Sequence, residues 1–283
     1  MIRPRLLWRL KRRELPLGER TLLMGVLNVT PDSFSDGGRF LDPDRAFARA
    51  LEMEEQGADI IDIGAESTRP GSTRISEAEE KRRLAPVLKR LRDKLVAPIS
   101  VDTYKAGVAE HALKLGAEII NDPSGLTFDP QLARVVARYD AGLVLNHMRG
   151  SPETWAKLGP LPDPLAAILQ DLEAAVHRAV RAGVDRARIV VDPGIGFGKR
   201  GEQNSEILAR LGKLAQLKLP VLVGPSRKSF LAQKTEEETR FATAAAVAAA
   251  ILGGAHIVRV HDVRQMRAVA AVADAILRCR EQA

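Results

Sequence analysis

The chain has a single cysteine, Cys279, so no disulfide bond can form within it. It also lacks any stretch of the roughly 18 uninterrupted apolar residues that a membrane-spanning helix needs. The first twenty residues are basic, but they have neither the long apolar segment nor the small-residue cleavage site of a secretion signal. We therefore expect a cytoplasmic protein with no membrane association.

Aromatic residues make up only 4% of the 283 residues, which leaves aliphatic and alanine side chains to fill the interior. The net charge is +7, but lysine and arginine are spread along the chain and form no aromatic-studded basic stripe. Nucleic-acid binding is therefore not expected, whereas attraction of small anions is compatible with this charge. The five histidines are too sparse and too badly spaced for a zinc site.

After Arg20, short aliphatic or β-branched runs alternate with longer amphipathic stretches, as in parallel βα units. Strands are expected at 22–28, 59–64, 97–102, 117–122, 142–147, 188–192, 220–224 and 256–260. Helices are expected near 43–57, 76–94, 105–115, 130–139, 163–182, 203–216, 240–252 and 263–280. An open doubly wound sheet is the alternative, but eight units in about 260 residues favour a closed (β/α)8 TIM barrel.

We predict one domain over residues 1–283. Within it, LLWRL (6–10) and ELPLG (14–18) are expected to form a short N-terminal hairpin that covers the bottom of the barrel. The small side chains of 241–254 allow close helix packing. Packing against the core is the default interpretation of that segment, and a dimer interface is the alternative.

Polar residues follow the predicted strands: Asn28, Asp62, Asp102, Asn121, His147, Asp192, Lys228 and His261. Each one alone could cap a helix or form a hydrogen bond within a loop. In a (β/α)8 barrel, however, the carboxyl ends of all strands surround one mouth, and barrel enzymes have their active sites there. The whole row is hard to explain as capping and predicts an active site at that mouth.

Seven segments occur in the order LNVTPDSFSDGG (27–38), DIGAESTRPG (62–71), SVDTYK (100–105), IND (120–122), DPGIGFGK (192–199), GPSRKSF (224–230) and RVHDV (259–263). Together they resemble the dihydropteroate synthases, a family of pterin-binding enzymes, from about residue 22 to the C-terminus. The first, second and sixth segments are long and chemically unusual, whereas IND alone would indicate little.

The resemblance implies that the mouth binds a pterin. Asp102, Asn121 and Asp192 match the pterin-binding residues of the family, and Lys228 matches a lysine that reaches the pterin carbonyl. The chemistry agrees, because a carboxylate can accept two neighbouring N–H donors while an amide both donates and accepts.

The resemblance also gives Arg259 and His261 a role in binding the pyrophosphate. The two residues are two apart at the end of a strand, so an extended chain points both to one side. Arginine suits phosphate through its forked donors, and it can also lie flat against the pterin. Asn28 is expected to offer a carboxamide oxygen to Mg2+, the implied cofactor.

Two loops rich in glycine, proline and serine, 29–40 and 64–75, follow the first two strands. The resemblance implies that they close over substrate and exclude water. Residues expected to form the p-aminobenzoate pocket or hold pyrophosphate are Phe34, Thr68, Arg69, Pro70, Phe197 and Ser229. Residues expected to act in catalysis are Asp32, Arg69, Lys228, Arg259 and His261.

The implied reaction joins 6-hydroxymethyl-7,8-dihydropterin pyrophosphate to p-aminobenzoate and gives 7,8-dihydropteroate and pyrophosphate. A methyltetrahydrofolate–corrinoid methyltransferase is one alternative, because it shares a pterin-binding barrel. A pterin-binding paralogue that has lost catalysis is another. The TPDSFSDGG, SRK and RVHD segments favour the synthase, for which we expect a homodimer.

Four positions depart from the usual pattern of the family. Asn146 stands where a methionine is usual in the pterin pocket, and Ala65 and Ala242 replace customary glycines. Pro225 lies at the variable position of the segment that contains Lys228 and could stiffen that loop. None of these residues removes a predicted polar binding group.

Overall fold

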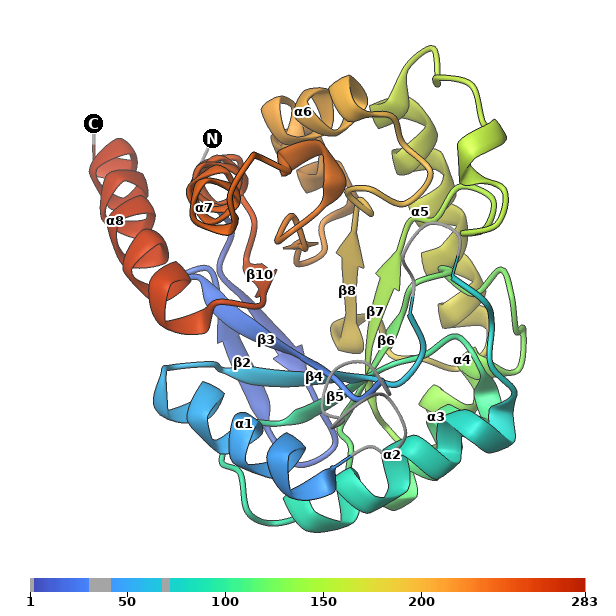
Figure 1. Cartoon of the computed structure of the whole chain (residues 1–283). Helices are drawn as coiled ribbons and strands as arrows, with labels where there is room; N and C mark the ends of the chain where they lie inside the picture. The colour runs from blue at the N-terminus through green and yellow to red at the C-terminus, as the bar shows by residue number, and fades with distance from the viewer. Residues whose placement is uncertain (1–2, 31–41, 68–71, 283) are drawn as a thin grey trace.

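The computed structural model describes residues 3–30, 42–67 and 72–282, and these form the predicted barrel (Figure 1). Eight parallel strands lie in the order β8-β7-β6-β5-β4-β3-β10-β9, and a parallel bridge between Val191 and Val221 joins the two ends of that sheet. The strands are β3 (Leu22–Asn28), β4 (Ile60–Gly64), β5 (Ile99–Asp102), β6 (Ile119–Asp122), β7 (Gly142–Asn146), β8 (Ile189–Asp192), β9 (Leu222–Val223) and β10 (Ile257–Val260).

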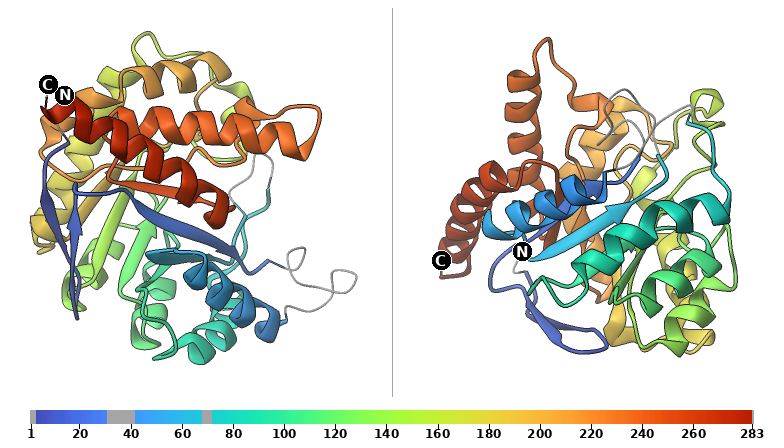
Figure 2. Two further views of the ribbon diagram at one scale, coloured as in Figure 1. Left: turned by 90° about the vertical axis from the view of Figure 1, so that its left-hand side faces the viewer. Right: turned by 60° about the horizontal axis from the view of Figure 1, so that its bottom comes forward.

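Helices cover the outside of this barrel (Figures 1 and 2), and consecutive helices contact each other from the first to the last. They are α1 (Pro43–Glu55), α2 (Glu77–Leu91), α3 (Ala106–Lys114), α4 (Leu132–Arg138), α5 (Pro164–Arg181), α6 (Gly201–Ala209), α7 (Glu236–Leu252) and α8 (Val263–Gln282). The predicted alternation of strands and helices is therefore confirmed.

Two helices differ from those expected by more than three residues at one end. The helix predicted at 203–216 is divided into α6 and a 3-10 segment, Leu211–Leu217, which contains the poor helix former Gly212. Helix α7 begins at Glu236 rather than near 240, because Thr235 and Glu238 form a capping box. The Thr235 hydroxyl accepts from the Glu238 backbone N–H at 3.1 Å, and the Glu238 carboxylate accepts from the Thr235 N–H at 3.0 Å.

One face of the segment 241–254 packs inward. Thr243, Ala246, Val247, Ala250 and Ile251 of α7 are buried, and α7 packs against α8. The default interpretation of that segment, packing against the core, is therefore confirmed.

Side chains alternate between the two faces of each strand, and this alternation sorts them into two cores. Outward-facing residues such as Leu143, Leu145 and Val191 belong to the large cluster under the helices. Inward-facing residues at the strand beginnings, such as Ile119, Val190 and Ile257, form a second apolar cluster inside the barrel. Two residues further along, the inward positions carry polar side chains, and this change from apolar to polar marks the mouth.

The N-terminal hairpin closes the bottom of the barrel, as predicted. Strands β1 (Leu6–Arg9) and β2 (Glu14–Leu17) pair antiparallel, and Trp8, Leu10 and Leu17 belong to the inner cluster. The Trp8 indole N–H donates to the Arg188 carbonyl at 2.8 Å. Gly142 leaves room for this packing, because a Cβ there would lie 2.5 Å from Leu10 Cδ2 and that side chain would have to move.

The beginning of the described chain is tied to its last helix. The buried Arg3 guanidinium contacts the Asp274 carboxylate of α8 at 2.9 Å and donates to the Thr21 hydroxyl at 2.7 Å. Thr21 in turn donates to Asp274 through its backbone N–H at 2.7 Å. This network fixes the residues that lead into β3, the first strand of the barrel.

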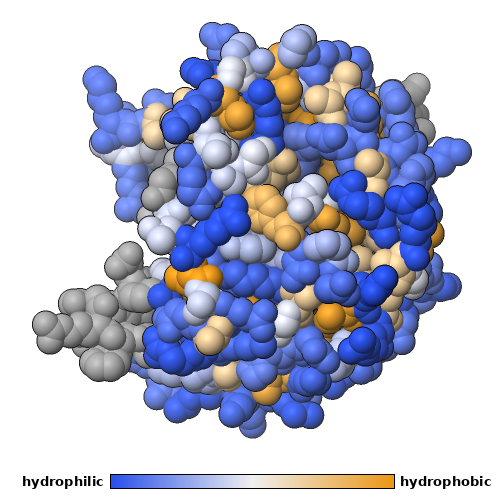
Figure 3. Space-filling model, turned by 90° about the vertical axis from the view of Figure 1, so that its right-hand side faces the viewer, coloured by the Kyte–Doolittle hydropathy of each residue, from blue (hydrophilic) through white to orange (hydrophobic). Residues whose placement is uncertain are grey.

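The outer surface over α4 and α5 is mostly hydrophilic, with scattered hydrophobic residues (Figure 3). Among the described residues, no helix combines the length and the apolar character needed to cross a membrane.

Candidate active site

Arg259 of β10 lies at the centre of the mouth, between two carboxylates from other strands. Its Nε donates to Asp62 of β4 at 2.6 Å, and its Nη2 donates to Asp102 of β5 at 2.8 Å. The Asn121 amide of β6 donates to the same Asp62 oxygen at 3.2 Å. Burial raises the pKa of Asp102, and the attraction of Arg259 opposes that rise. Four strands are therefore joined through polar side chains in the barrel interior.

Asp192 ends β8 with one carboxylate oxygen held and the other available. Its Oδ1 accepts from the Gly194 backbone N–H at 2.7 Å, whereas its Oδ2 has no hydrogen-bond partner among the described residues. Burial raises the pKa of Asp192 to about 6, so the carboxylate is ionised at neutral pH. Gly194 has φ +68°, and a Cβ there would lie 1.9 Å from the His147 carbonyl oxygen, so only glycine fits.

Lys228, in the loop after β9, lies against an aromatic ring from the loop after β8. Its Nζ is 4.0 Å from the centre of the Phe197 ring, and that ring makes an edge contact with Trp155 at 5.5 Å. Burial and the nearby Arg259 charge lower the pKa of Lys228 to about 8. Ser229, which is exposed, begins the 3-10 turn Ser229–Leu231 that follows. The predicted pterin residue Lys228 and the predicted p-aminobenzoate residue Phe197 are therefore in contact.

His261 follows β10, two residues after Arg259. Its Nδ1 is 3.0 Å from the Ser226 hydroxyl, and its backbone N–H donates to the same oxygen at 3.3 Å. Burial, reinforced by the charges of Arg259 and Arg227, lowers the pKa of His261 to about 3. The imidazole is therefore neutral at physiological pH and can donate only one N–H.

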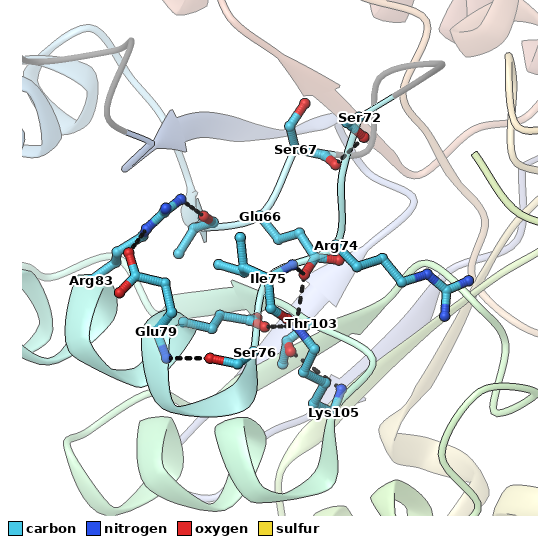
Figure 4. A network of polar contacts seen from close by, with 12 residues as sticks. Glu66, Ser67, Ser72, Arg74, Ile75, Ser76, Glu79, Arg83, Thr103 and Lys105 are labelled. Atoms are coloured by element: carbon cyan, nitrogen blue, oxygen red, sulfur yellow. Dashed lines mark hydrogen bonds and ion pairs between the residues drawn. The ribbon is translucent and has the colours of Figure 1, made fainter. Parts of the chain in front are cut away.

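The sequence did not single out the residues that support the second loop. Glu66 accepts from Lys105 at 2.6 Å and from the Ile75 backbone N–H at 2.9 Å (Figure 4). Lys105 also donates to the buried Glu80 at 2.5 Å. Burial raises the pKa of Glu80. This network ties both ends of the loop to α2 and to the start of α3. Glu66 lies in the DIGAESTRPG segment and Lys105 in the SVDTYK segment. Their place in two segments typical of the family was the only indication in the sequence of a role at the site.

Two further supporting residues were also missed. Asp62 was noted only as one of several polar residues near a strand end, and its contact with Arg259 was not predicted. The buried Lys199 ammonium donates to the carbonyls of His147, Pro193 and Gly194 at 2.8, 2.8 and 2.6 Å. Burial lowers its pKa well below the usual value. Lys199 therefore fixes the loop that carries Gly194 and Phe197.

The predicted metal ligand Asn28 ends β3 beside Gly64. A Cβ at Gly64 would lie 3.8 Å from the Asn28 Oδ1 and 3.9 Å from the Asp102 Oδ2, so these two side chains flank the glycine. The residues that the structure describes contain no group of three or more His, Cys, Asp or Glu side chains that could hold a metal ion. A cation at Asn28 would need further ligands from substrate or water.

Five of the predicted residues lie outside the described part of the chain: Asp32, Phe34, Thr68, Arg69 and Pro70. The other predicted site residues line the carboxyl ends of the strands or the loops that follow them.

Comparison with known proteins identifies the family. The family model described as "Pterin binding enzyme" matches residues 24–261. A dihydropteroate synthase from Synechocystis is 46% identical over 265 residues, which are 92% of this chain and 92% of that protein. The dihydropteroate synthase of Bacillus subtilis is 47% identical over 262 residues, covering 92% of this chain and 90% of that protein.

Solved structures agree with the sequence comparison. A dihydropteroate synthase from Clostridium difficile, determined in the presence of pteroic acid, has a TM-score of 0.86 and 45% identity, covering 92% of this chain and 98% of that one. The Xanthomonas albilineans enzyme with 4-aminobenzoic acid has a TM-score of 0.88 and 37% identity, covering 96% and 98%. The chain therefore belongs to the pterin-binding enzyme family and, within it, to the dihydropteroate synthases.

Proposed function

We propose that the active site at the mouth of this barrel catalyses the joining of 6-hydroxymethyl-7,8-dihydropterin pyrophosphate to p-aminobenzoate. The supporting observation is the convergence of Asp102, Asn121, Asp192, Lys228 and Arg259 on one end of the barrel. The free oxygen of Asp192 accepts N–H donors of the pterin, and Asn121 pairs with the adjacent edge. Arg259, already held by two carboxylates, supports the flat face of the ring.

The reaction needs a leaving group and an oriented amine rather than a protein nucleophile. The bond between the pterin methylene and the pyrophosphate oxygen breaks, and both electrons leave with pyrophosphate. The arylamine nitrogen then forms the new C–N bond and loses one proton. Arg259 and His261 stabilise the departing charge, while Phe197 and Ser229 orient the p-aminobenzoate. For Asp32, Phe34, Thr68, Arg69 and Pro70, the roles in loop closure and substrate contact stay predictions.

Magnesium is the proposed cofactor, held by Asn28. A carboxamide oxygen is a hard ligand, and Mg2+ commonly takes few protein ligands and completes its shell with substrate phosphate and water. One such oxygen beside Asp102 at the mouth fits that mode of binding. When bound, the ion would neutralise charge on the pyrophosphate.

A second copy of the chain is the proposed partner. Val272 and Ile276 of α8 are 63% and 42% exposed, and together with Ala271, Ala275 and Cys279 they line a shallow apolar surface. Apolar surface of this kind on a soluble enzyme favours self-association. We propose that α8 contributes to a homodimer interface, and a cytoplasmic location stays a prediction.

Replacement of Asp192 should weaken pterin binding. Asp192→Ala removes the free acceptor, and buried pterin donors left unpaired cost about 1–3 kcal/mol, a loss of about 5- to 160-fold in affinity. Isothermal titration with the pterin substrate measures this loss. Asp44→Ala, an exposed carboxylate on α1, is the matched control and should bind normally. Unchanged affinity in Asp192→Ala would remove this residue from the pterin site.

Pterin affinity should have a maximum between about pH 6 and 8. Below about pH 6 the Asp192 carboxylate, whose pKa burial raises, becomes protonated and loses its capacity to accept two donors. Above about pH 8 the Lys228 ammonium, whose pKa burial lowers, loses its charge. Lys228→Arg should abolish only the upper decline, because a guanidinium stays charged. Titrations across this range test the assignment, and an upper decline that persists in Lys228→Arg contradicts it.

Asn28→Ala should raise the Mg2+ concentration that gives half-maximal turnover. The expected increase is at least about tenfold, the loss found when even an outer-shell partner of a metal ligand is removed. Turnover is measured as dihydropteroate and pyrophosphate formed together. Chelation should abolish it in the unaltered enzyme. Pterin binding without product would favour a paralogue without catalysis, and methyl transfer to a corrinoid would favour the methyltransferase alternative.

Charge introduced on α8 should convert a dimer to a monomer. Val272→Asp with Ile276→Asp places two carboxylates on the proposed interface, where burial without partners is unfavourable. Val96→Asp is the matched control, because Val96 is 81% exposed outside α8. Sedimentation velocity distinguishes the two states. The proposal is wrong if the unaltered chain is monomeric or if the double variant remains dimeric.

A further inference from the structure

The loop after β9 and the turn after β10 are joined by two adjacent bridges. The Ser226 hydroxyl oxygen lies 3.3 Å from the backbone nitrogen of His261 and 3.0 Å from the imidazole Nδ1 of the same residue. The next residue of the loop, Arg227, donates to the next residue of the turn, Asp262, through its Nε at 3.2 Å and its Nη2 at 2.8 Å. Neighbouring residues are thus paired in register, and His261 cannot shift relative to Lys228 without breaking both bridges.

Arg227 is held in an unusual backbone conformation by these contacts. Its φ is +56°, in the left-handed region that a residue with a Cβ seldom occupies. Its bonds to Asp262, a further contact with Glu236 at 3.4 Å and a backbone bond to the Thr243 hydroxyl at 3.4 Å oppose relaxation. The Arg227–Asp262 pair therefore fixes the separation at which Ser226 meets the imidazole.

The hydrogen count at Ser226 decides which nitrogen of His261 carries the proton. The Ser226 oxygen accepts from the His261 backbone N–H, so its own hydrogen is free to be donated. Ser226 is 5% exposed, and Nδ1 of His261 is the one remaining partner of its hydroxyl among the described residues. A proton on Nδ1 would point at this oxygen and leave the hydroxyl hydrogen without an acceptor, which is unfavourable in a buried position. The hydroxyl therefore donates to Nδ1.

The charges that face His261 favour a neutral imidazole. Arg259 on its own strand and Arg227 and Lys228 on the neighbouring loop are cationic, and Asp262 is the opposing carboxylate. Asp262 is already paired with Arg227, so it compensates an imidazolium only weakly. A neutral ring with its proton on Nε2 satisfies Ser226 and avoids a fourth positive charge. Nε2 forms no hydrogen bond within the described part of the chain.

We infer that Ser226 is a positioning residue that holds His261 as the neutral Nε2–H tautomer, so that the ring presents one N–H donor to the departing pyrophosphate. The inference rests on the role proposed above for His261 in binding that group. Without the serine hydroxyl, the ring could rotate or carry its proton on Nδ1. It would then present an acceptor, which repels phosphate oxygens, where a donor is needed.

The tautomer is measured directly in the full-length enzyme by long-range 1H–15N correlation spectra of the five histidines. The His261 signals are assigned by their loss in His261→Gln. We expect Nε2 protonated and Nδ1 unprotonated, unchanged between about pH 5.5 and 8, where an unperturbed histidine would titrate. Ser226→Ala should give a mixture of tautomers, and Ser226→Thr, which keeps the hydroxyl, should restore the single one.

Ser100→Ala is the matched control, because Ser100 is also a buried serine of the barrel interior, but its hydroxyl has no hydrogen-bond partner among the residues that the structure describes. Ser226→Ala should lower kcat by about tenfold or more, since loss of one donor to a developing charge commonly has at least that effect. The KM for p-aminobenzoate should change less than about twofold, as expected for an interaction specific to the transition state. Ser100→Ala should leave both constants unchanged.

Three results would overturn the inference: a His261 proton on Nδ1, a titration of His261 in this pH range, or a kcat in Ser226→Ala equal to that of Ser100→Ala. Failure of the proposed function gives a different result. An unaltered enzyme that forms no dihydropteroate would contradict the function, while the spectra would still decide the tautomer.

Discussion

The buried contact of Arg259 with Asp62 and Asp102 is the interaction on which the mouth depends. It joins β10 to β4 and β5 across the barrel interior, and Asn121 extends it to β6. A buried ion cluster of this kind seldom stabilises a fold more than well-packed apolar residues of the same volume would. One Asp62 oxygen even lacks a hydrogen-bond partner among the described residues. We therefore interpret the cluster as preorganisation of the active site, because the two carboxylates orient the Arg259 guanidinium before any ligand binds.

The other end of the barrel stabilises the structure that carries this charged group. The hairpin side chains Trp8, Leu10 and Leu17 complete an apolar cluster with the inward residues at the strand beginnings. The polar side chains at the mouth thus lie above an apolar layer, in which the indole N–H of Trp8 donates to the Arg188 carbonyl. This division between a stable bottom and a polar top is the usual one in (β/α)8 barrels.

The sequence predicted the strands and their polar ends well, because both follow from local periodicity. It could not predict that Arg259 would contact Asp62, since 197 residues separate them and the contact depends on the register between strands. The Ser226–His261 bond was hidden for the same reason, although SRK and RVHD were both recognised as segments. The early start of α7 is different. Thr235 and Glu238 form a readable capping box, so that boundary was available from the sequence.

Asn146 is a position at which the family resemblance could not predict the local contacts, because a methionine is usual there. Its amide donates to the Pro123 carbonyl at 3.2 Å, and its Oδ1 is buried without a partner in the described residues. A Cβ at Gly194 would lie 2.8 Å from that Oδ1 and 2.7 Å from the Lys199 ammonium, so Asn146 lies behind the loop that Lys199 fixes. The Asn146 oxygen is therefore enclosed beside Gly194. The asparagine that stands in place of the usual methionine is therefore in contact range of the loop that carries Gly194 and Phe197.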